Sequence, residues 1–137
     1  MAKLLNAALL FQTLLADDAP PSATVASDLD VDSFDEIPFV THSANIAQDG
    51  AGPDLWTATL VVNIFAPPRD SFDVAAYLYA AITGWGEDPD AGIVPGVGAV
   101  ERLDDLNAFV QVSGEVSMVN KIVVHYQGTF TLLVRAY

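Results

Sequence analysis

The strongest structural signal in this chain is the stretch WTATLVVNIFAPPRDSFDVAAYLYAAITGW, residues 56–85. Its first part, Trp56 to Phe65, alternates between apolar side chains and a more polar set, a pattern that predicts a strand with one apolar face. The prolines that follow predict a turn, and Asp70 or Ser71 then caps a helix that continues to Trp85. We expect the buried side of this helix to consist of Phe72, Ala75, Ala76, Leu78, Tyr79, Ile82 and Trp85.

Weaker patterns on either side complete the element order. Before the central stretch they predict a helix over residues 3–16, a short strand over 24–29, an acidic connector over 28–36 and a strand over 38–46. After it they predict a long loop over 86–107 and a hairpin of two strands, 108–118 and 121–137, that turns near Val119-Asn120. We expect their inward side chains to be Ala108, Val110, Val112, Val116 and Met118 in the first strand, and Ile122, Val124, Tyr126, Phe130, Leu132 and Val134 in the second.

This order predicts a single domain of the α+β class over residues 1–137. A chain of this length forms one domain and buries about 70% of the surface that its unfolded form exposes. We expect a mostly antiparallel sheet of about four to five strands, packed with the N-terminal helix and one central helix.

The apolar content is high for so short a chain. Hydrophobic residues make up 52% of the sequence, and the mean hydropathy is +0.36. The sequence has no run of about 18 uncharged apolar residues that would indicate a membrane span. We therefore expect several apolar side chains to lie at subunit interfaces, and the protein to be an oligomer.

The charge balance is strongly acidic. Eighteen Asp and Glu face five Lys and Arg, which gives a formal net charge of −13. The basic residues are scattered singly at Lys3, Arg69, Arg102, Lys121 and Arg135. A binder of nucleic acid or of an anionic membrane needs clustered cations, so this pattern argues against both. The chain has no cysteine, so it offers neither disulfides nor thiolate metal ligands.

The first residues fit two interpretations. One positive charge, Lys3, before an apolar run resembles a secretion signal. However, polar residues recur at near-helical spacing and share one face: Lys3, Asn6, Thr13 and Asp17. Because the apolar part of a signal needs no such stripe, we expect a helix docked on the domain.

Two motifs were tested for chemistry, and both fail. Asp28, Asp30 and Asp32 alternate as in a calcium loop, but the sixth and twelfth positions hold Ser33 and Phe39 in place of Gly and Glu. We expect a solvated acidic loop there. The glycines at 92, 96 and 98 do not form a dinucleotide fingerprint, because Glu101 stands where the third glycine is needed.

The remaining titratable residues also favour structural roles. His42 and His125 each lie inside a predicted strand, and no nucleophile elbow surrounds any serine. Neighbouring carboxylates could pair as acid and base, but in so acidic a chain they are more often surface charge. The two tryptophans, Trp56 and Trp85, fit core or interface anchors. We expect no enzymatic activity, no cofactor and no metal site.

The element order resembles the tail terminator (tail completion) proteins of long-tailed, non-contractile bacteriophages. The resemblance covers nearly the whole chain and follows its pattern without a diagnostic motif. It rests on Leu4-Leu5 and Leu14-Leu15 of the N-terminal helix, Ile37-Pro38-Phe39-Val40, Trp56 to Phe65, Pro67-Pro68-Arg69, the helix from Phe72 to Trp85, and the terminal strand Phe130 to Tyr137.

This resemblance implies a structural virion protein that forms a hexameric ring. Such a ring caps the tail tube, ends its polymerisation and joins it to the head connector, while DNA passes through without tight binding. The implied partners are further copies of the chain, the tail tube protein and the connector, with no membrane. The implied location is the head–tail junction of the virion, and the host cytoplasm during assembly.

An acidic ring would suit the passage of DNA. Six copies would carry about −78, six times the −13 of one chain. We expect the lumen to be lined by the acidic residues of the loop that follows the central helix: Glu87, Asp88, Asp90, Glu101, Asp104 and Asp105.

Other functions remain open at this stage. Another head–tail connector, such as a stopper or adaptor, shares the small α+β format, and a tail tube subunit differs in that it would stack without limit. A secreted ligand-binding module would require the N-terminal run to be a signal. A small enzyme would need the catalytic motifs that the sequence lacks.

Overall fold

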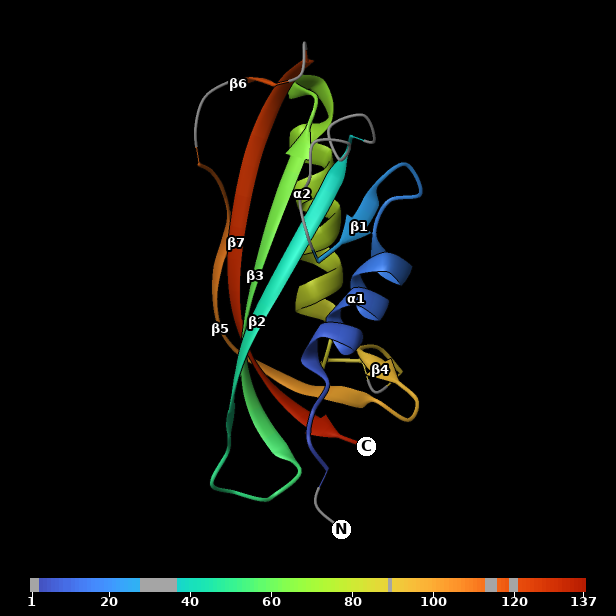
Figure 1. Cartoon of the computed structure of the whole chain (residues 1–137), viewed down its shortest axis with the longest axis vertical. Helices are drawn as coiled ribbons and strands as arrows, with labels where there is room; N and C mark the ends of the chain where they lie inside the picture. The colour runs from blue at the N-terminus through green and yellow to red at the C-terminus, as the bar shows by residue number, and fades with distance from the viewer. Residues whose placement is uncertain (1–2, 28–36, 89, 113–115, 119–120) are drawn as a thin grey trace.

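The computed structural model describes residues 3–27, 37–88, 90–112, 116–118 and 121–137 (Figure 1). In these ranges the chain forms two helices, α1 (Ala7–Asp18) and α2 (Pro68–Gly84). The strands of the same ranges are β1 (Thr24–Ala26), β2 (Phe39–Gln48), β3 (Leu55–Ala66), β4 (Ile93–Val94), β5 (Gly98–Gln111), β6 (Val116–Met118) and β7 (Lys121–Ala136).

The strands form one long, twisted sheet. Their order is β1-β2-β3-β7-β5-β4, and β6 pairs with the first residues of β7. The pairing of β1 with β2 is parallel, and the other pairings are antiparallel. The predicted α+β class is confirmed. The sheet is larger than the expected four to five strands, and its mixed character matches the antiparallel prediction only roughly.

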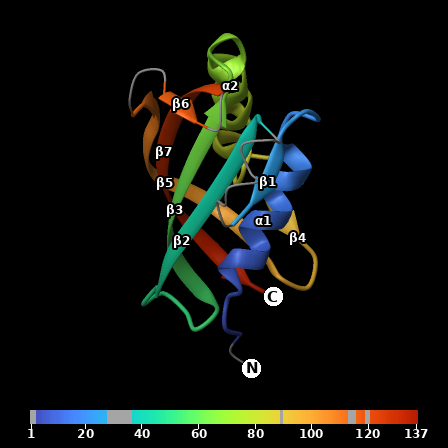
Figure 2. The ribbon, with the colours of Figure 1, turned by 45° about the horizontal axis from the view of Figure 1, so that its top comes forward.

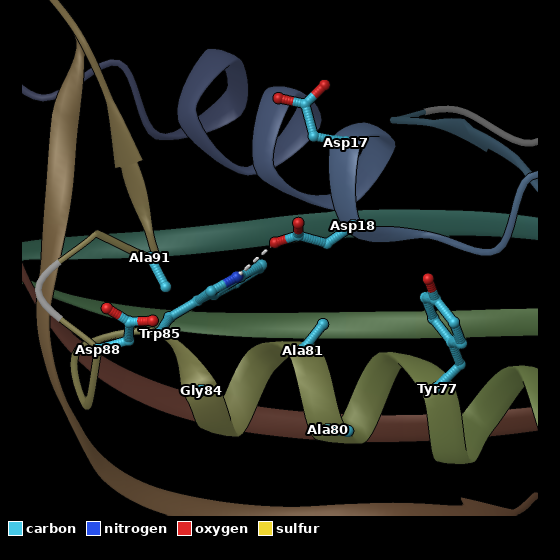
Figure 3. Close-up of a pocket in the computed structure, with 9 residues that line it drawn as sticks. All are labelled: Asp17, Asp18, Tyr77, Ala80, Ala81, Gly84, Trp85, Asp88 and Ala91. Carbon is cyan, nitrogen blue, oxygen red and sulfur yellow. Dashed lines mark hydrogen bonds between the residues drawn. The ribbon is translucent and has the colours of Figure 1, made fainter.

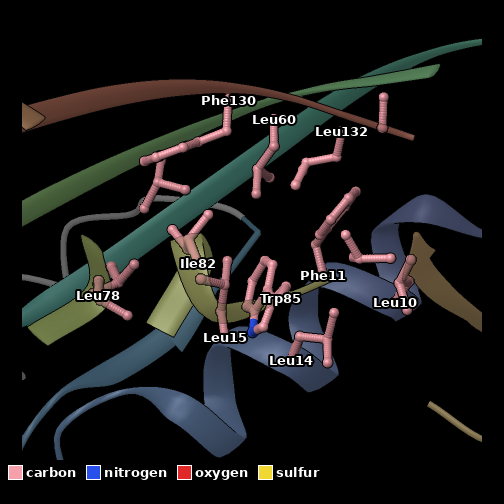
Figure 4. Packing of buried hydrophobic residues seen from close by; sticks show 14 of the residues in the cluster. Leu10, Phe11, Leu14, Leu15, Leu60, Leu78, Ile82, Trp85, Phe130 and Leu132 are labelled. Carbon is pink, nitrogen blue, oxygen red and sulfur yellow. The ribbon is translucent and has the colours of Figure 1, made fainter. Parts of the chain in front are cut away.

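One face of the central strands β3 and β7 forms the sheet side of the hydrophobic core. The apolar face predicted for β3 is confirmed, since Ala58, Leu60, Val62 and Ile64 are all fully buried. On β7 the neighbours Phe130, Leu132 and Val134 are fully buried too, as predicted. Ile122, expected on the same face, is 54% exposed. Both helices pack their apolar sides on this face, and Figure 4 shows the resulting core.

Helix α1 starts later and ends later than predicted. The Asn6 side chain accepts a hydrogen bond from the Leu9 backbone N–H, and this N-cap fixes the first turn. Residues 3–6 are not helical; the Lys3 backbone instead contacts Asp54 and the Trp56 indole of the β3 region. The expected docking of this helix is present, because Leu10, Phe11, Leu14 and Leu15 are buried in the core.

Helix α2 begins at Pro68 rather than after Asp70 or Ser71. Proline at the first helical position has the right φ and needs no N–H partner, so Pro67-Pro68 starts the helix. The buried stripe is Ser71, Val74, Ala75, Leu78 and Ile82. The expected burial of Phe72, Ala76 and Tyr79 is therefore wrong, with Phe72 68% exposed. The helix has apolar residues on more than one side, so periodicity alone could not select the side that meets the sheet.

Strand β5 occupies residues 98–107 of the loop predicted over 86–107, and β4 occupies two more (Figures 1 and 2). Its register against β7 shifts between Val100 and Arg102, between Leu103 and Asp105, and between Asn107 and Val110. Each shift places extra residues on β5, so inward side chains recur every third residue rather than every second. These inward residues, which pack against the core, are Val100, Leu103, Leu106 and Phe109.

The inward set predicted for residues 108–118 is wrong for the same reason. Val110 is 62% exposed and Val112 is 51% exposed, and Ala108 is also exposed. The structure does not describe three other parts of these predictions: the side chains of Val116 and Met118, the acidic connector at 28–36 and the turn at Val119-Asn120.

Within the described ranges, neither helix is long and apolar enough to cross a membrane.

Candidate functional site

A groove of about 480 Å³ lies between the last turn of α1 and the second half of α2 (Figure 3). The Ala80 and Ala81 side chains, the Gly84 backbone and Trp85 give the groove an apolar base, and Tyr77 lies at one end. The residues that line it are Asp17, Asp18, Tyr77, Ala80, Ala81, Gly84, Trp85, Asp88 and Ala91.

Trp85 joins the two helices beneath this groove. Its backbone leaves the helix in an extended conformation directly after Gly84, and its ring is only 1% exposed. The indole Nε1–H donates to Asp18 Oδ2 over 2.8 Å, and the ring stacks on Phe11 of α1 with centroids 6.3 Å apart. The expectation that Trp85 is a core anchor is confirmed. A charge-assisted hydrogen bond of this kind holds the C-terminal turn of α1 against the end of α2.

Two glycines shape the loop that follows Trp85. Gly86 and Gly92 have φ of +84° and +74°, in the region that side chains disfavour. A Cβ on Gly92 would lie 2.9 Å from Trp85 Cβ, so the loop could not return past the tryptophan with a larger residue. Of the three glycines considered for a dinucleotide fingerprint, Gly92 and Gly96 have positive φ in this loop, whereas Gly98 begins β5.

The groove is negatively charged. Asp17, Asp18 and Asp88 line it, and none of the nine lining residues is Lys or Arg. Asp88 also orders its own loop, because its Oδ1 accepts a hydrogen bond from the Asp90 backbone N–H over 2.9 Å. The sequence does not predict this groove, because Asp17 fits the polar face of the N-terminal helix and no local pattern links it to Asp88.

The six predicted lumen residues divide between two places. Glu87, Asp88 and Asp90 lie in the loop after α2, whereas Glu101, Asp104 and Asp105 lie along β5. Asp88 and Glu101 meet at a smaller cavity of about 240 Å³. The structure thus brings one residue of each group together, and Asp104 and Asp105 continue along the strand. Whether these residues face a lumen stays a prediction.

Two of these carboxylates are partly neutralised by arginines. Glu101 Oε1 accepts a hydrogen bond from Arg135 Nε at 2.8 Å, and Asp104 pairs with Arg102. These side-chain hydrogen bonds raise the pKa of both guanidinium groups, which stay charged. Both pairs are solvent-exposed, so each contributes little to stability.

The two histidines contact side-chain amides. His42 Nε2 lies 2.6 Å from Gln12 Oε1, and the Gln12 amide nitrogen donates to the Val25 carbonyl. His125 Nε2 lies 2.7 Å from Asn63 Oδ1, and its ring stacks on Phe65. Burial lowers the pKa of both rings below the ordinary value of 6.5. These contacts hold α1 to β2 and β7 to β3, which fits structural roles.

A second, apolar groove lies on the other side of α2. It has a volume of about 150 Å³ and is lined by Phe72, Ala75, Ala76, Tyr79, Ala108, Phe109 and Tyr126. Phe109 faces the core here, whereas the next residue of β5, Val110, points to solvent. No sequence signal separated these exposed residues from core positions, because their pattern is also apolar.

Among the described residues, no group of three or more His, Cys, Asp or Glu side chains is placed to hold a metal ion. The rejected calcium-loop motif at 28–32 lies outside the described ranges. A comparison with known protein families and with curated proteins finds no match for this chain.

Proposed function

We propose that this protein is a structural component of a bacteriophage tail, a ring that caps the tail tube and joins it to the head connector. The ring consists of copies of this chain, six by the resemblance described above. It ends polymerisation of the tube, and its acidic lumen lets DNA pass without holding it.

The observation that carries the proposal is the exposed apolar surface of a folded domain. Phe72, Tyr77, Tyr79 and Val110 are large apolar side chains, and all are exposed although the core is complete without them. Phe72 and Tyr79 line the second groove, Tyr77 lines the first, and Val110 lies on the solvent side of β5. Large exposed apolar side chains on several surfaces are typical of a protein that contacts neighbouring subunits.

The outer edge of β5 supports a ring that ends the tube over a subunit that stacks without limit. In the part of the chain that the structure describes, β4 covers only Gly98 and Ala99 of this edge. The rest of β5 is irregular in register and carries Glu101, Asp104 and Asp105. Bulges and charges on an edge strand prevent further strands from adding.

Native mass spectrometry and electron microscopy of the purified protein test the proposal. A closed ring of defined copy number that binds the end of tail tubes is the expected result. Long polymers would identify a tube subunit instead, and a ring that binds the portal side but no tube would identify a stopper or adaptor. A protein that stays monomeric and leaves tubes uncapped would refute the proposal.

A further inference from the structure

We propose that the groove between α1 and α2 receives the Arg69 side chain of a neighbouring copy of this chain. This contact rests on the proposed ring and supplies one of its subunit interfaces. In this contact, the start of α2 in one copy meets the groove of the next copy.

The groove is large enough to hold a long side chain. Its base is apolar, made by Ala80, Ala81, Gly84 and the buried Trp85. Its volume of about 480 Å³ is in the range of sites that bind ligand groups. The Asp18–Trp85 hydrogen bond fixes the two walls relative to each other, so the groove exists before a partner arrives.

The charge of the groove favours a cationic side chain. Asp17, Asp18 and Asp88 line it around the apolar base, and none of its lining residues is basic. A guanidinium group satisfies such a site well, because it bonds carboxylates in a fork and lies flat on aromatic rings such as Tyr77. An anionic group would be repelled.

Arg69 is the arginine that has no carboxylate partner in the part of the chain that the structure describes. Arg102 and Arg135 already pair with Asp104 and Glu101. Arg69 is exposed in the first turn of α2, and it forms no ion pair with any residue in the described ranges. Lys3 is also exposed, but it lies in the non-helical segment before α1 and lacks a planar head group.

The two complementary surfaces lie toward opposite ends of one helix. Arg69 is the second residue of α2, and the groove is lined by its second half, from Tyr77 to Gly84. With a rise of about 1.5 Å per residue, Arg69 lies about 12 Å along the helix axis from Tyr77 and about 22 Å from Gly84. At least two helical turns therefore separate Arg69 from the α2 residues of the groove within one copy. When two different surfaces of the same chain bind each other, the copies join head to tail. They close into a ring if the rotation from one copy to the next divides a full turn evenly. A twofold pair could also satisfy it, and the copy number decides between the two.

Cysteine cross-linking tests the contact, because the chain has no cysteine of its own. The double variant Asp73→Cys with Ala16→Cys keeps Arg69 and the three groove carboxylates, and both replaced residues are exposed. It is treated with a short bis-maleimide at the highest soluble concentration, and we expect a ladder of cross-linked species that ends at the copy number of the ring. Arg102→Cys with Ala16→Cys is the matched control and should give no ladder, since Arg102 lies on β5.

Charge reversal gives an independent readout. Arg69→Glu should weaken self-association about tenfold or more, measured by analytical ultracentrifugation. Adding Asp17→Arg to the same chain should restore it. Both sites are exposed, and circular dichroism verifies that the variants keep the wild-type fold.

The outcomes separate this contact from the proposed function. A ladder that ends at two confirms the contact and refutes the ring. A ring seen by native mass spectrometry without cross-links between positions 73 and 16 leaves the proposed function standing and overturns the contact. Cross-links from Leu4→Cys, beside Lys3, to Ala16→Cys in place of Asp73→Cys overturn the choice of occupant. A chain that neither associates nor cross-links overturns the contact as well.

Discussion

Asp18 and Trp85 link the two helices through a single hydrogen bond, and its loss is a direct test of how the groove is held. Asp18→Ala leaves the buried indole N–H without an acceptor, so we expect a loss of about 1–3 kcal/mol in the free energy of unfolding, measured in urea. Asp18→Asn keeps an acceptor oxygen and should cost less. Asp17→Ala, one residue away and exposed, is the control and should change stability by less than about 0.5 kcal/mol.

His42 should make stability depend on pH. Burial lowers its pKa in the folded protein below the ordinary 6.5, so the unfolded chain binds the proton more readily. The stabilising effect is complete above the unfolded pKa and is lost as pH falls from about 6.5 toward the lowered value. His42→Gln should flatten the pH dependence of the unfolding free energy between about pH 7.5 and 5. His125→Gln, which keeps the His42 contribution, is the comparison, and an unchanged slope in His42→Gln would contradict the assignment.

At the scale of elements, β5 offers the sharpest contrast between the sequence pattern and the structure. Leu106 packs against the core opposite Phe130, whereas Val110 points to solvent. We expect Leu106→Ala to cost about 1–2 kcal/mol, because the side chain is half-buried. Val110→Ala should cost less than about 0.5 kcal/mol. Chemical denaturation of both variants provides the measurement, and equal losses would mean that the three-residue spacing is wrong.

The accuracy of the sequence-based predictions followed the regularity of each element. Strand β3 alternates strictly and lies in the middle of the sheet, so its extent and buried face were predicted within a residue or so. Strand β5 keeps an apolar face only through its register shifts, which depend on pairing with a strand distant in sequence. No local pattern encodes such a shift. The groove was missed because Asp17, Asp18 and Asp88 come together only when α1 and the end of α2 pack.

At the scale of the whole molecule, some carboxylates have an arginine partner and others have none. Glu101 and Asp104 on β5 are paired, whereas Arg69 forms no pair in the described part of the chain and the groove has no cation of its own. An assembly of like-charged chains needs local attractive contacts to offset the general repulsion. In the proposed assembly, the exposed Arg69 and the acidic groove would supply such a contact, and the remaining carboxylates would disfavour DNA binding.

This distribution of charge predicts whether the proposed ring binds DNA. Glu87→Lys combined with Asp105→Lys changes the charge of two expected lumen positions, and we expect the assembled variant to retain duplex DNA at about 50 mM salt and release it near 200 mM. The wild-type ring should not bind at either concentration. Asp54→Lys with Asp73→Lys makes the same change outside the predicted lumen. Electrophoretic mobility shifts compare the three, and equal DNA binding by both variants would mean that the lumen is not lined by the predicted acidic residues.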